Sequence, residues 1–257
     1  MTSCLCVENL NYTYPDGTQA LMDINIRINE GEKVALIGAN GSGKSTLQFH
    51  LNGLLQAQSG KVWVNQSAVI PANFTRIRAW IGLVFQNPDD QLFMPTVEED
   101  IAFGPKNLGV KGAILNRLVR DSLEAVNLDP DHYLHRNPEH LSGGEKKRVA
   151  IAGVLAMQPQ ILVLDEPSAQ LDPRSRRQLI ELLAQLPVTQ LIATHDLDLA
   201  LELCDRSLVL SRGHLVYDGS IWPLMADHAF LARHALESPL SFARPYCNLK
   251  DHPLSSV

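Results

Sequence analysis

Apolar and polar residues alternate along two early segments of the chain, residues 4–10 and 20–28. This period of two is typical of half-buried antiparallel strands. Longer apolar runs at residues 33–37, 80–85, 161–166 and 190–196 predict strands that are more deeply buried. The runs at 161–166 and 190–196 are typical of a parallel sheet. A further strand is predicted at residues 61–65 and a closing hairpin over residues 207–219.

The spacing becomes helical between residue 97 and about residue 141. It is clearest at Val119, Leu123, Val126 and Asn127, which recur every three to four residues. Loop signals interrupt this region, so we predict a small helical subdomain there. A further helical segment is predicted at about 225–236, before an irregular Pro-rich tail. Strands that alternate with helices predict an α/β fold with a mainly parallel sheet.

A glycine-rich loop stands between the strand at 33–37 and the next helix. It fits the pattern G-x-x-x-x-G-K-[ST], in which glycines let backbone N–H groups turn toward a polyphosphate at a helix N-terminus. The lysine would reach the β- and γ-phosphates, and the following serine would bind Mg²⁺. The alternative is a glycine-rich turn with a chance lysine. The loop consists of Gly38, Ala39, Asn40, Gly41, Ser42, Gly43, Lys44 and Ser45, and Thr46 follows it.

Polar residues end two of the buried strands. Asp165 and Glu166 close the run at 161–166, where carboxylates would be costly to bury without compensation. Beside a phosphate loop, Asp165 would face Mg²⁺ and Glu166 a water molecule. A strand that simply enters a polar loop is the alternative. His195 ends the next strand and is a candidate contact for the γ-phosphate, although a single histidine there is more often structural.

A second pair of glycines stands at the start of a predicted helix. Ser142 is a good N-cap, and Glu145 three residues later completes a capping box, so an ordinary capped helix explains the pattern. Gly143 and Gly144 also allow a second anion site at this helix N-terminus.

Two other residues are ambiguous when taken alone. Tyr14 lies beside a turn signal, where an aromatic ring can stack on a base or simply belong to a strand edge. Gln86 follows the strand at 80–85, which is unremarkable without further context.

Composition narrows the class of protein. The chain has 257 residues, of which 45% are hydrophobic, and its net charge is −6. This is typical of a soluble globular protein and argues against one built mainly to hold nucleic acid. We see neither a signal peptide nor an apolar stretch long enough to cross a bilayer, so we expect a cytosolic chain. Four sparse cysteines, Cys4, Cys6, Cys204 and Cys247, predict neither a zinc site nor a disulfide framework.

Taken together, these segments resemble the ATP-binding subunit of an ABC transporter from about Val7 to Gly219. Six motifs of that family occur in its order, which makes chance occurrence negligible. They are Walker A at 38–45, the Q-loop at Gln86, the signature loop at 141–145, Walker B at 161–166, the D-loop at 168–172 and the switch histidine at His195.

The resemblance implies that two ATPase subunits sandwich two ATP molecules, and that Walker A of one subunit meets the signature loop of the other. Its catalytic residues would be Glu166, His195 and Gln86, and Mg²⁺ would be held by Ser45, Gln86 and Asp165. Tyr14 would stack on adenine, and nucleotide contacts would also come from residues 38–46, Ser142, Gly143, Gly144 and Asp172. Glu145 replaces the usual glutamine and Gln170 a common glycine, which affects the expected dimer contact.

Residues 85–93 and 96–105 are similar to the ATPases of energy-coupling-factor importers, with the cobalt and nickel importers the closest group. The implied partners are a second ATPase subunit, a transmembrane coupling subunit and a substrate-binding membrane subunit, at the cytoplasmic face of the membrane. A vitamin importer is the alternative, and an ABC ATPase that works away from membranes is a weaker one. We expect an ATPase domain over residues 1–220, with a helical subdomain at about 88–155, and an extension over residues 221–257.

Overall fold

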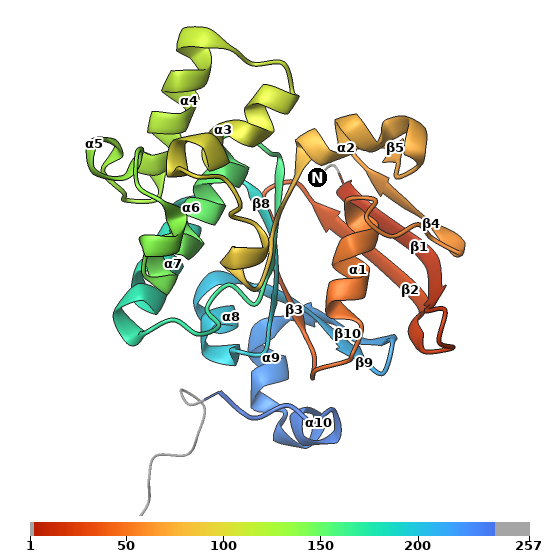
Figure 1. Cartoon of the computed structure of the whole chain (residues 1–257). Coiled ribbons are helices and arrows are strands. Elements are labelled where there is room, and N and C mark those ends of the chain that lie inside the picture. Colours follow the sequence, from red (N-terminus) through yellow and green to blue (C-terminus); the bar gives the residue numbers. More distant parts are fainter. Residues whose placement is uncertain (1–2, 240–257) are drawn as a thin grey trace, which may run out of the picture.

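The computed structural model describes residues 3–239, which form two sheets and the helices that cover them (Figure 1). The larger sheet has six strands in the order β10-β9-β3-β8-β7-β6, and all neighbouring pairs are parallel except β10 and β9. The smaller sheet is antiparallel, in the order β2-β1-β4-β5. The α/β fold with a mainly parallel sheet is therefore confirmed, and the antiparallel strands predicted at residues 4–10 and 20–28 belong to a separate antiparallel β-subdomain.

The elements have the following bounds. The strands are β1 (Ser3–Thr13), β2 (Gln19–Asn29), β3 (Lys33–Ile37), β4 (Ser59–Val64), β5 (Ser67–Ala68), β6 (Ile81–Val84), β7 (Ile161–Asp165), β8 (Thr189–Thr194), β9 (Arg206–Ser211) and β10 (His214–Ser220). The α-helices are α1 (Lys44–Leu51), α2 (Phe74–Trp80), α3 (Val97–Asn107), α4 (Gly112–Ala125), α5 (Pro130–Tyr133), α6 (Gly143–Leu155), α7 (Pro173–Gln185), α8 (Leu197–Leu203), α9 (Ile221–Ala226) and α10 (His228–Arg233). Short 3₁₀ turns lie at Pro71–Asn73, Pro88–Asp90 and Pro138–His140.

The six-stranded sheet separates two hydrophobic cores. In β3, Val34 and Leu36 face the core shared with α1 and the small sheet, whereas Ala35 and Ile37 face the core shared with the helices of the other side. Successive residues of a strand point to opposite faces, so a strand buried on both faces must be apolar throughout. This explains the continuous apolar runs in the sequence.

The helical region predicted between residues 97 and 141 contains α3, α4 and α5, and α3 and α4 pack against α6. Val119, Leu123 and Val126 are buried as expected. Asn127 is an exception, because α4 ends at Ala125 and Asn127 is an exposed turn residue with φ of 57°. Asparagine tolerates this left-handed conformation better than most residues.

The predicted single helical segment at 225–236 is wrong in its extent. The chain forms two short helices, α9 and α10, because Asp227 interrupts them and accepts a hydrogen bond from Phe230 N as the N-cap of α10. Ile221, Met225 and Leu231 are buried in the same core as the large sheet. The Pro-rich tail and Cys247 lie outside the described residues, and the three described cysteines are free thiols.

Candidate nucleotide-binding and catalytic site

The phosphate loop, residues 38–45, connects the end of β3 to the start of α1. Two of its glycines have close neighbours that exclude a side chain. A Cβ atom at Gly38 would lie 2.4 Å from the carbonyl oxygen of Leu210, and one at Gly43 would lie 2.5 Å from that of Ala20. Gly43 also has φ of 109°. Steric fit and backbone conformation therefore both require glycine in this loop.

Lys44 is buried and its ammonium group lies within the loop. Its Nζ atom donates to the carbonyl oxygen of Gly38 at 2.6 Å and lies 3.7 Å from a carboxylate oxygen of Glu166. Nearby, the Ser42 hydroxyl is buried and finds no hydrogen-bond partner among the described residues. A cation and an unpartnered hydroxyl at a helix N-terminus fit an anionic ligand such as a polyphosphate.

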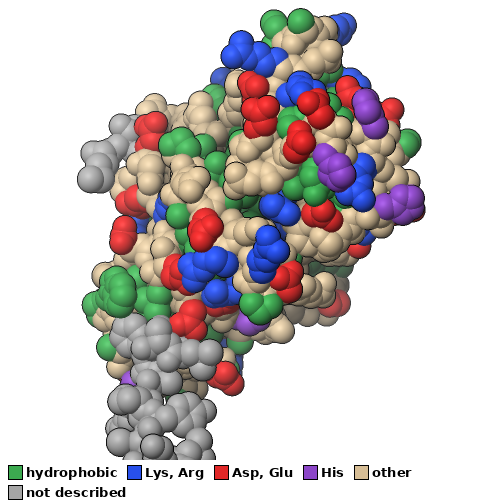
Figure 2. Space-filling view, turned by 90° about the vertical axis from the view of Figure 1, so that its left-hand side faces the viewer, with side chains coloured by type: hydrophobic (Ala, Val, Ile, Leu, Met, Phe, Trp, Pro, Cys, Tyr) green, Lys and Arg blue, Asp and Glu red, His purple; other side chains and the backbone are tan. Residues whose placement is uncertain are grey.

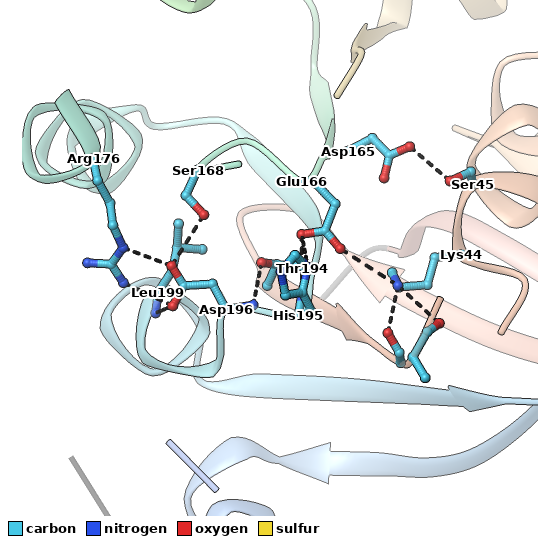
Figure 3. Close-up of polar contacts among 12 residues, drawn as sticks. Lys44, Ser45, Asp165, Glu166, Ser168, Arg176, Thr194, His195, Asp196 and Leu199 are labelled. Carbon is cyan, nitrogen blue, oxygen red and sulfur yellow. Dashed lines mark hydrogen bonds and ion pairs between the residues drawn. The ribbon is translucent and has the colours of Figure 1, made fainter. Parts of the chain in front are cut away.

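Ser45 and Asp165 meet across the site, since the Ser45 hydroxyl donates to Asp165 Oδ2 at 2.9 Å (Figure 3). Burial raises the pKa of the Asp165 carboxyl, and the hydrogen bond from Ser45 opposes part of that shift. Among residues 3–239, no group of three or more His, Cys, Asp or Glu residues could hold a metal ion. Mg²⁺ is commonly bound by one or two carboxylates together with substrate phosphates, so this oxygen pair fits it.

Glu166 follows β7 directly and adopts a left-handed φ of 42°. Its carboxylate is buried between Lys44 and the loop after β8. His195 Nδ1 lies 2.8 Å from Glu166 Oε2, and the backbone N–H of His195 donates to the same oxygen at 3.2 Å. The His195 side chain is 64% exposed, so its ring reaches from the buried acid to the open cavity.

These residues line one cavity of about 330 Å³. Tyr14 forms one of its walls, and its hydroxyl hydrogen bonds with that of Thr46 at 3.0 Å. Tyr12 packs edge-on against Tyr14 with ring centroids 5.0 Å apart. The structure thus brings most of the predicted site residues together. The predicted residues at the cavity are Tyr14, Asn40, Gly41, Ser42, Gly43, Lys44, Ser45, Thr46, Gln86, Asp165, Glu166 and His195.

The remaining predicted residues lie elsewhere. Gly38 and Ala39 contribute the carbonyl oxygens that hold Lys44. The signature-loop residues Ser142, Gly143 and Gly144 do not line this cavity, and neither does Asp172, which is the N-cap of α7. Within one chain, the phosphate loop and the signature loop therefore do not form a common site.

Figure 3 shows a cluster that the sequence analysis missed. Asp196 follows His195 and accepts two hydrogen bonds from Arg176 of α7, at 2.8 and 3.0 Å. It also accepts from the Ser168 hydroxyl at 3.3 Å and caps α8 through Leu199 N at 3.0 Å. The cluster thus joins the D-loop and α7 to the residue after the switch histidine. The adjacency of His195 and Asp196 was the available signal, but it does not identify Arg176.

Lys147 was also missed, because it belongs to a run of basic residues that is usually a solvated surface. It is fully buried, and its Nζ donates to the backbone carbonyl oxygens of Phe85 and Gln86. Burial lowers the pKa of Lys147 to about 8. Two further contacts join the same segments, an ion pair of Lys146 with Asp89 at 2.6 Å and a hydrogen bond from Gln91 Nε2 to Ala150 O at 2.9 Å.

On the face drawn in Figure 2, basic and acidic side chains are intermixed rather than gathered into a basic stripe. Among residues 3–239 there is no helix with the length and apolar character needed to span a membrane.

The strand–loop–helix that cradles Lys44, together with the acids and the histidine at the ends of β7 and β8, defines a P-loop ATPase. The ABC transporter family matches residues 21–169, which is more than half of the chain. The chain therefore belongs to the ABC transporter family and is an ABC-type ATPase that binds ATP.

Similar proteins agree with this assignment. A protein of Gloeobacter violaceus, provisionally named an ABC transporter ATP-binding protein, is 56% identical over 95% of this chain and 100% of its own length. The energy-coupling factor transporter ATP-binding protein EcfA of Methanothermobacter thermautotrophicus is 46% identical over 91% of this chain and 76% of its own length.

Two solved structures extend the comparison to the fold. Clostridium perfringens cbiO1, described as part of the ABC transporter complex cbiONQ, is 38% identical with a TM-score of 0.80, over 91% of this chain and 94% of its own. The ATP-binding cassette MJ0796, in a dimeric post-hydrolysis state bound to ADP and Pi, is 28% identical with a TM-score of 0.75, over 84% of this chain and 98% of its own.

Proposed function

We propose that this chain is the ATP-hydrolysing subunit of an energy-coupling-factor importer. The observation that carries the proposal is the cavity in which the phosphate loop, the Ser45–Asp165 pair and the Glu166–His195 pair meet. The similarity to EcfA of Methanothermobacter thermautotrophicus supports the subfamily.

The proposal gives roles to seven residues of the cavity. Lys44 binds the β- and γ-phosphates, and Tyr14 stacks on the base. Ser45, Gln86 and Asp165 hold Mg²⁺, which neutralises phosphate charge when it is bound. Glu166 orients or deprotonates the attacking water, and His195 contacts the γ-phosphate. Positioning and charge stabilisation supply most of the rate in such chemistry.

The substitution Glu166→Gln tests the catalytic assignment. The amide keeps the size of the side chain but cannot act as a base, so hydrolysis should nearly cease while ATP binding persists. Steady-state phosphate release and equilibrium ATP binding measure the two properties separately. Normal hydrolysis by this variant would refute the role of Glu166.

A second ATPase subunit is the first partner that we propose. Ser142, Gly143, Gly144 and Asp172 lie outside the cavity of their own chain, so a second subunit is needed to bring such residues to the phosphates. Because all six motifs occur in this chain, a homodimer would contain two complete sites, and a heterodimer with a related chain is the alternative. The dimeric form of MJ0796 supports a sandwich of this type.

A membrane subunit is the second partner. An apolar groove of about 600 Å³ lies beside residues 85–93, and Phe93 and Phe103 pack edge-on at its rim with ring centroids 5.0 Å apart. Phe93 is 63% exposed and Phe103 40% exposed, so the two rings form a contiguous apolar patch beside the groove, as at surfaces that bind partners. We propose that a coupling helix of a transmembrane subunit binds here, at the cytoplasmic face of the membrane. Asp89 already pairs with Lys146, so Asp90 is the acid that we assign to basic residues of that helix.

The transported substrate is a finer proposal. The similarity to cbiO1, described as part of cbiONQ, favours the cobalt and nickel class, and a vitamin is the alternative. ATP-dependent uptake of radiolabelled cobalt and nickel into vesicles, with the chain co-expressed with its genomic neighbours, tests this. Uptake that Lys44→Ala abolishes would support the metal class. Intact ATPase activity without metal uptake would favour a vitamin importer with a different substrate-binding subunit.

We also propose the domain boundaries given above, with an ATPase domain over residues 1–220, a helical subdomain at about 88–155 and an extension from residue 221. The packing of α3 and α4 against α6 supports the helical subdomain. The burial of Ile221 and Leu231 in the main core indicates that the first part of the extension folds onto the ATPase domain.

A further inference from the structure

The N-terminal end of α6 is occupied by an acid of the chain itself. Ser142 is the N-cap of this 13-residue helix, and Glu145 lies in its first turn. The backbone N–H of Ser142 donates to Glu145 Oε2 at 2.8 Å, and the Ser142 hydroxyl donates to the same oxygen at 2.7 Å. One carboxylate oxygen thus binds both donors that Ser142 possesses.

The other oxygen of this carboxylate is also bound. The Tyr133 hydroxyl donates to Glu145 Oε1 at 2.6 Å, which anchors the acid to the last residue of α5. Burial alone would raise the pKa of Glu145, but the hydrogen bonds from Tyr133 and Ser142 outweigh it and lower the pKa to about 2. At neutral pH this group is a fixed negative charge at the start of α6.

The negative charge of Glu145 matters because the Ser142 hydroxyl has only one proton to donate. A serine hydroxyl has one proton, and a carboxylate can only accept hydrogen bonds. The Ser142 proton therefore goes either to Glu145 or to an incoming phosphate, but not to both. A glutamine at position 145 would differ, because its amide nitrogen could donate to the Ser142 oxygen and leave the hydroxyl proton available.

We propose that Glu145 is a built-in competitor of phosphate, which holds the Ser142 donors and must release the hydroxyl proton before the signature loop can bind the ATP of a second subunit. This inference rests on the homodimeric sandwich of the proposed function. It assigns Tyr133 as a positioning residue, which keeps the carboxylate directed at Ser142. The consequence is a higher ATP concentration for dimer formation than a glutamine would require.

The test compares two variants in a Glu166→Gln background, where slow hydrolysis lets an ATP-bound dimer accumulate. The full chain is titrated with Mg-ATP, and the dimer fraction is measured by analytical ultracentrifugation. Glu145→Gln keeps the shape of the cap but removes the charge, so the half-saturating ATP concentration should fall about tenfold, the scale of one charge-assisted hydrogen bond.

Tyr133→Phe is the second variant. It leaves the charge of Glu145 but removes the donor that keeps the carboxylate directed at Ser142, so the ATP requirement should fall, though by less than in Glu145→Gln. A purely structural role of the cluster would instead move both variants toward weaker dimerisation.

The outcomes separate the two hypotheses. If the parent protein dimerises with Mg-ATP and Glu145→Gln does not lower the ATP requirement, the competitor role of Glu145 is wrong and the proposed function stands. If neither protein dimerises at saturating Mg-ATP, the homodimeric sandwich and this inference are both overturned.

Discussion

The ion pair between Arg176 and Asp196 offers a direct test of how the loop of His195 is held. Its side chains are 26% and 24% exposed, and both nitrogen–oxygen contacts are within 3.0 Å. Arg176→Gln would leave the Asp196 carboxylate with Ser168 and the backbone of α8 as its remaining hydrogen-bond donors. We expect both the free energy of unfolding and the rate of hydrolysis to fall.

The expected magnitude follows from the burial of the pair. Exposed ion pairs contribute about 1 kcal/mol or less, and hydrogen bonds to charged groups contribute about 1.5–3 kcal/mol. A pair that is three-quarters buried lies between these limits, so we expect a loss of about 2 kcal/mol. In a chain of this size that corresponds to a decrease in Tm of about 4–8 °C.

A matched control lies one residue further along α7. Arg177 pairs with Glu202 of α8 through two contacts, so it also joins α7 to α8, but its side chain is 51% exposed and that of Glu202 is 34% exposed. Arg177→Gln should cost about 0.5 kcal/mol, or a Tm decrease of about 1–2 °C. It should leave hydrolysis unchanged, because Glu202 does not adjoin His195.

Thermal unfolding and steady-state ATPase assays measure both effects. For Arg176→Gln, kcat should fall roughly tenfold while KM for ATP changes little. The reason is that a displaced His195 affects the hydrolysis step more than it affects the binding of ATP. Equal Tm losses in the two variants, or an unchanged kcat in Arg176→Gln, would show that this pair does not position the switch histidine.

Three further predictions concern separate parts of the chain. Gly43→Ala should lower stability by about 2 kcal/mol or more and abolish ATP binding in calorimetry, whereas Gly153→Ala, whose Cβ would meet atoms no nearer than 3.8 Å, should be tolerated. The pKa of Glu145 in the folded chain is about 2, below its usual 4.5, so the contribution of Glu145 to stability is complete above about pH 4.5 and is lost as the pH falls toward 2. The difference in Tm between the parent and Glu145→Gln should therefore shrink between about pH 4.5 and about pH 2. Because burial raises the pKa of Cys204 to about 12, peptide mapping should find it unmodified by iodoacetamide at pH 8 until the chain unfolds.

Local pattern was sufficient to predict most of the fold. The strand at Lys33–Ile37 and the capping box at Ser142 are encoded within a few residues, and both occur as expected. The predicted helix boundaries were wrong where the helical spacing of residues continues beyond the residue at which the helix ends. Asn127 keeps the spacing of α4 but ends it in a left-handed turn, and Asp227 divides one predicted helical segment into two.

In the site too, residues of a contiguous motif could be predicted, whereas contacts between residues far apart in the sequence could not. The phosphate loop is a continuous motif, so its residues could be identified without the structure. The bond between Arg176 and Asp196 joins residues 20 positions apart, and Lys147 reaches residues more than 60 positions away in the chain. Such contacts depend on how α6 and α7 pack, which no local pattern encodes.

The ties between α6 and residues 85–91 have a mechanical consequence. Lys147 donates to two carbonyl oxygens of that segment, Lys146 pairs with Asp89, and Gln91 donates to Ala150 O, so four contacts within about one turn of α6 join the helix to the segment. The segment borders the apolar groove, and the start of the same helix carries the signature loop. We therefore expect a displacement of residues 85–91 at the groove to move the start of α6, and with it the signature loop, as one unit.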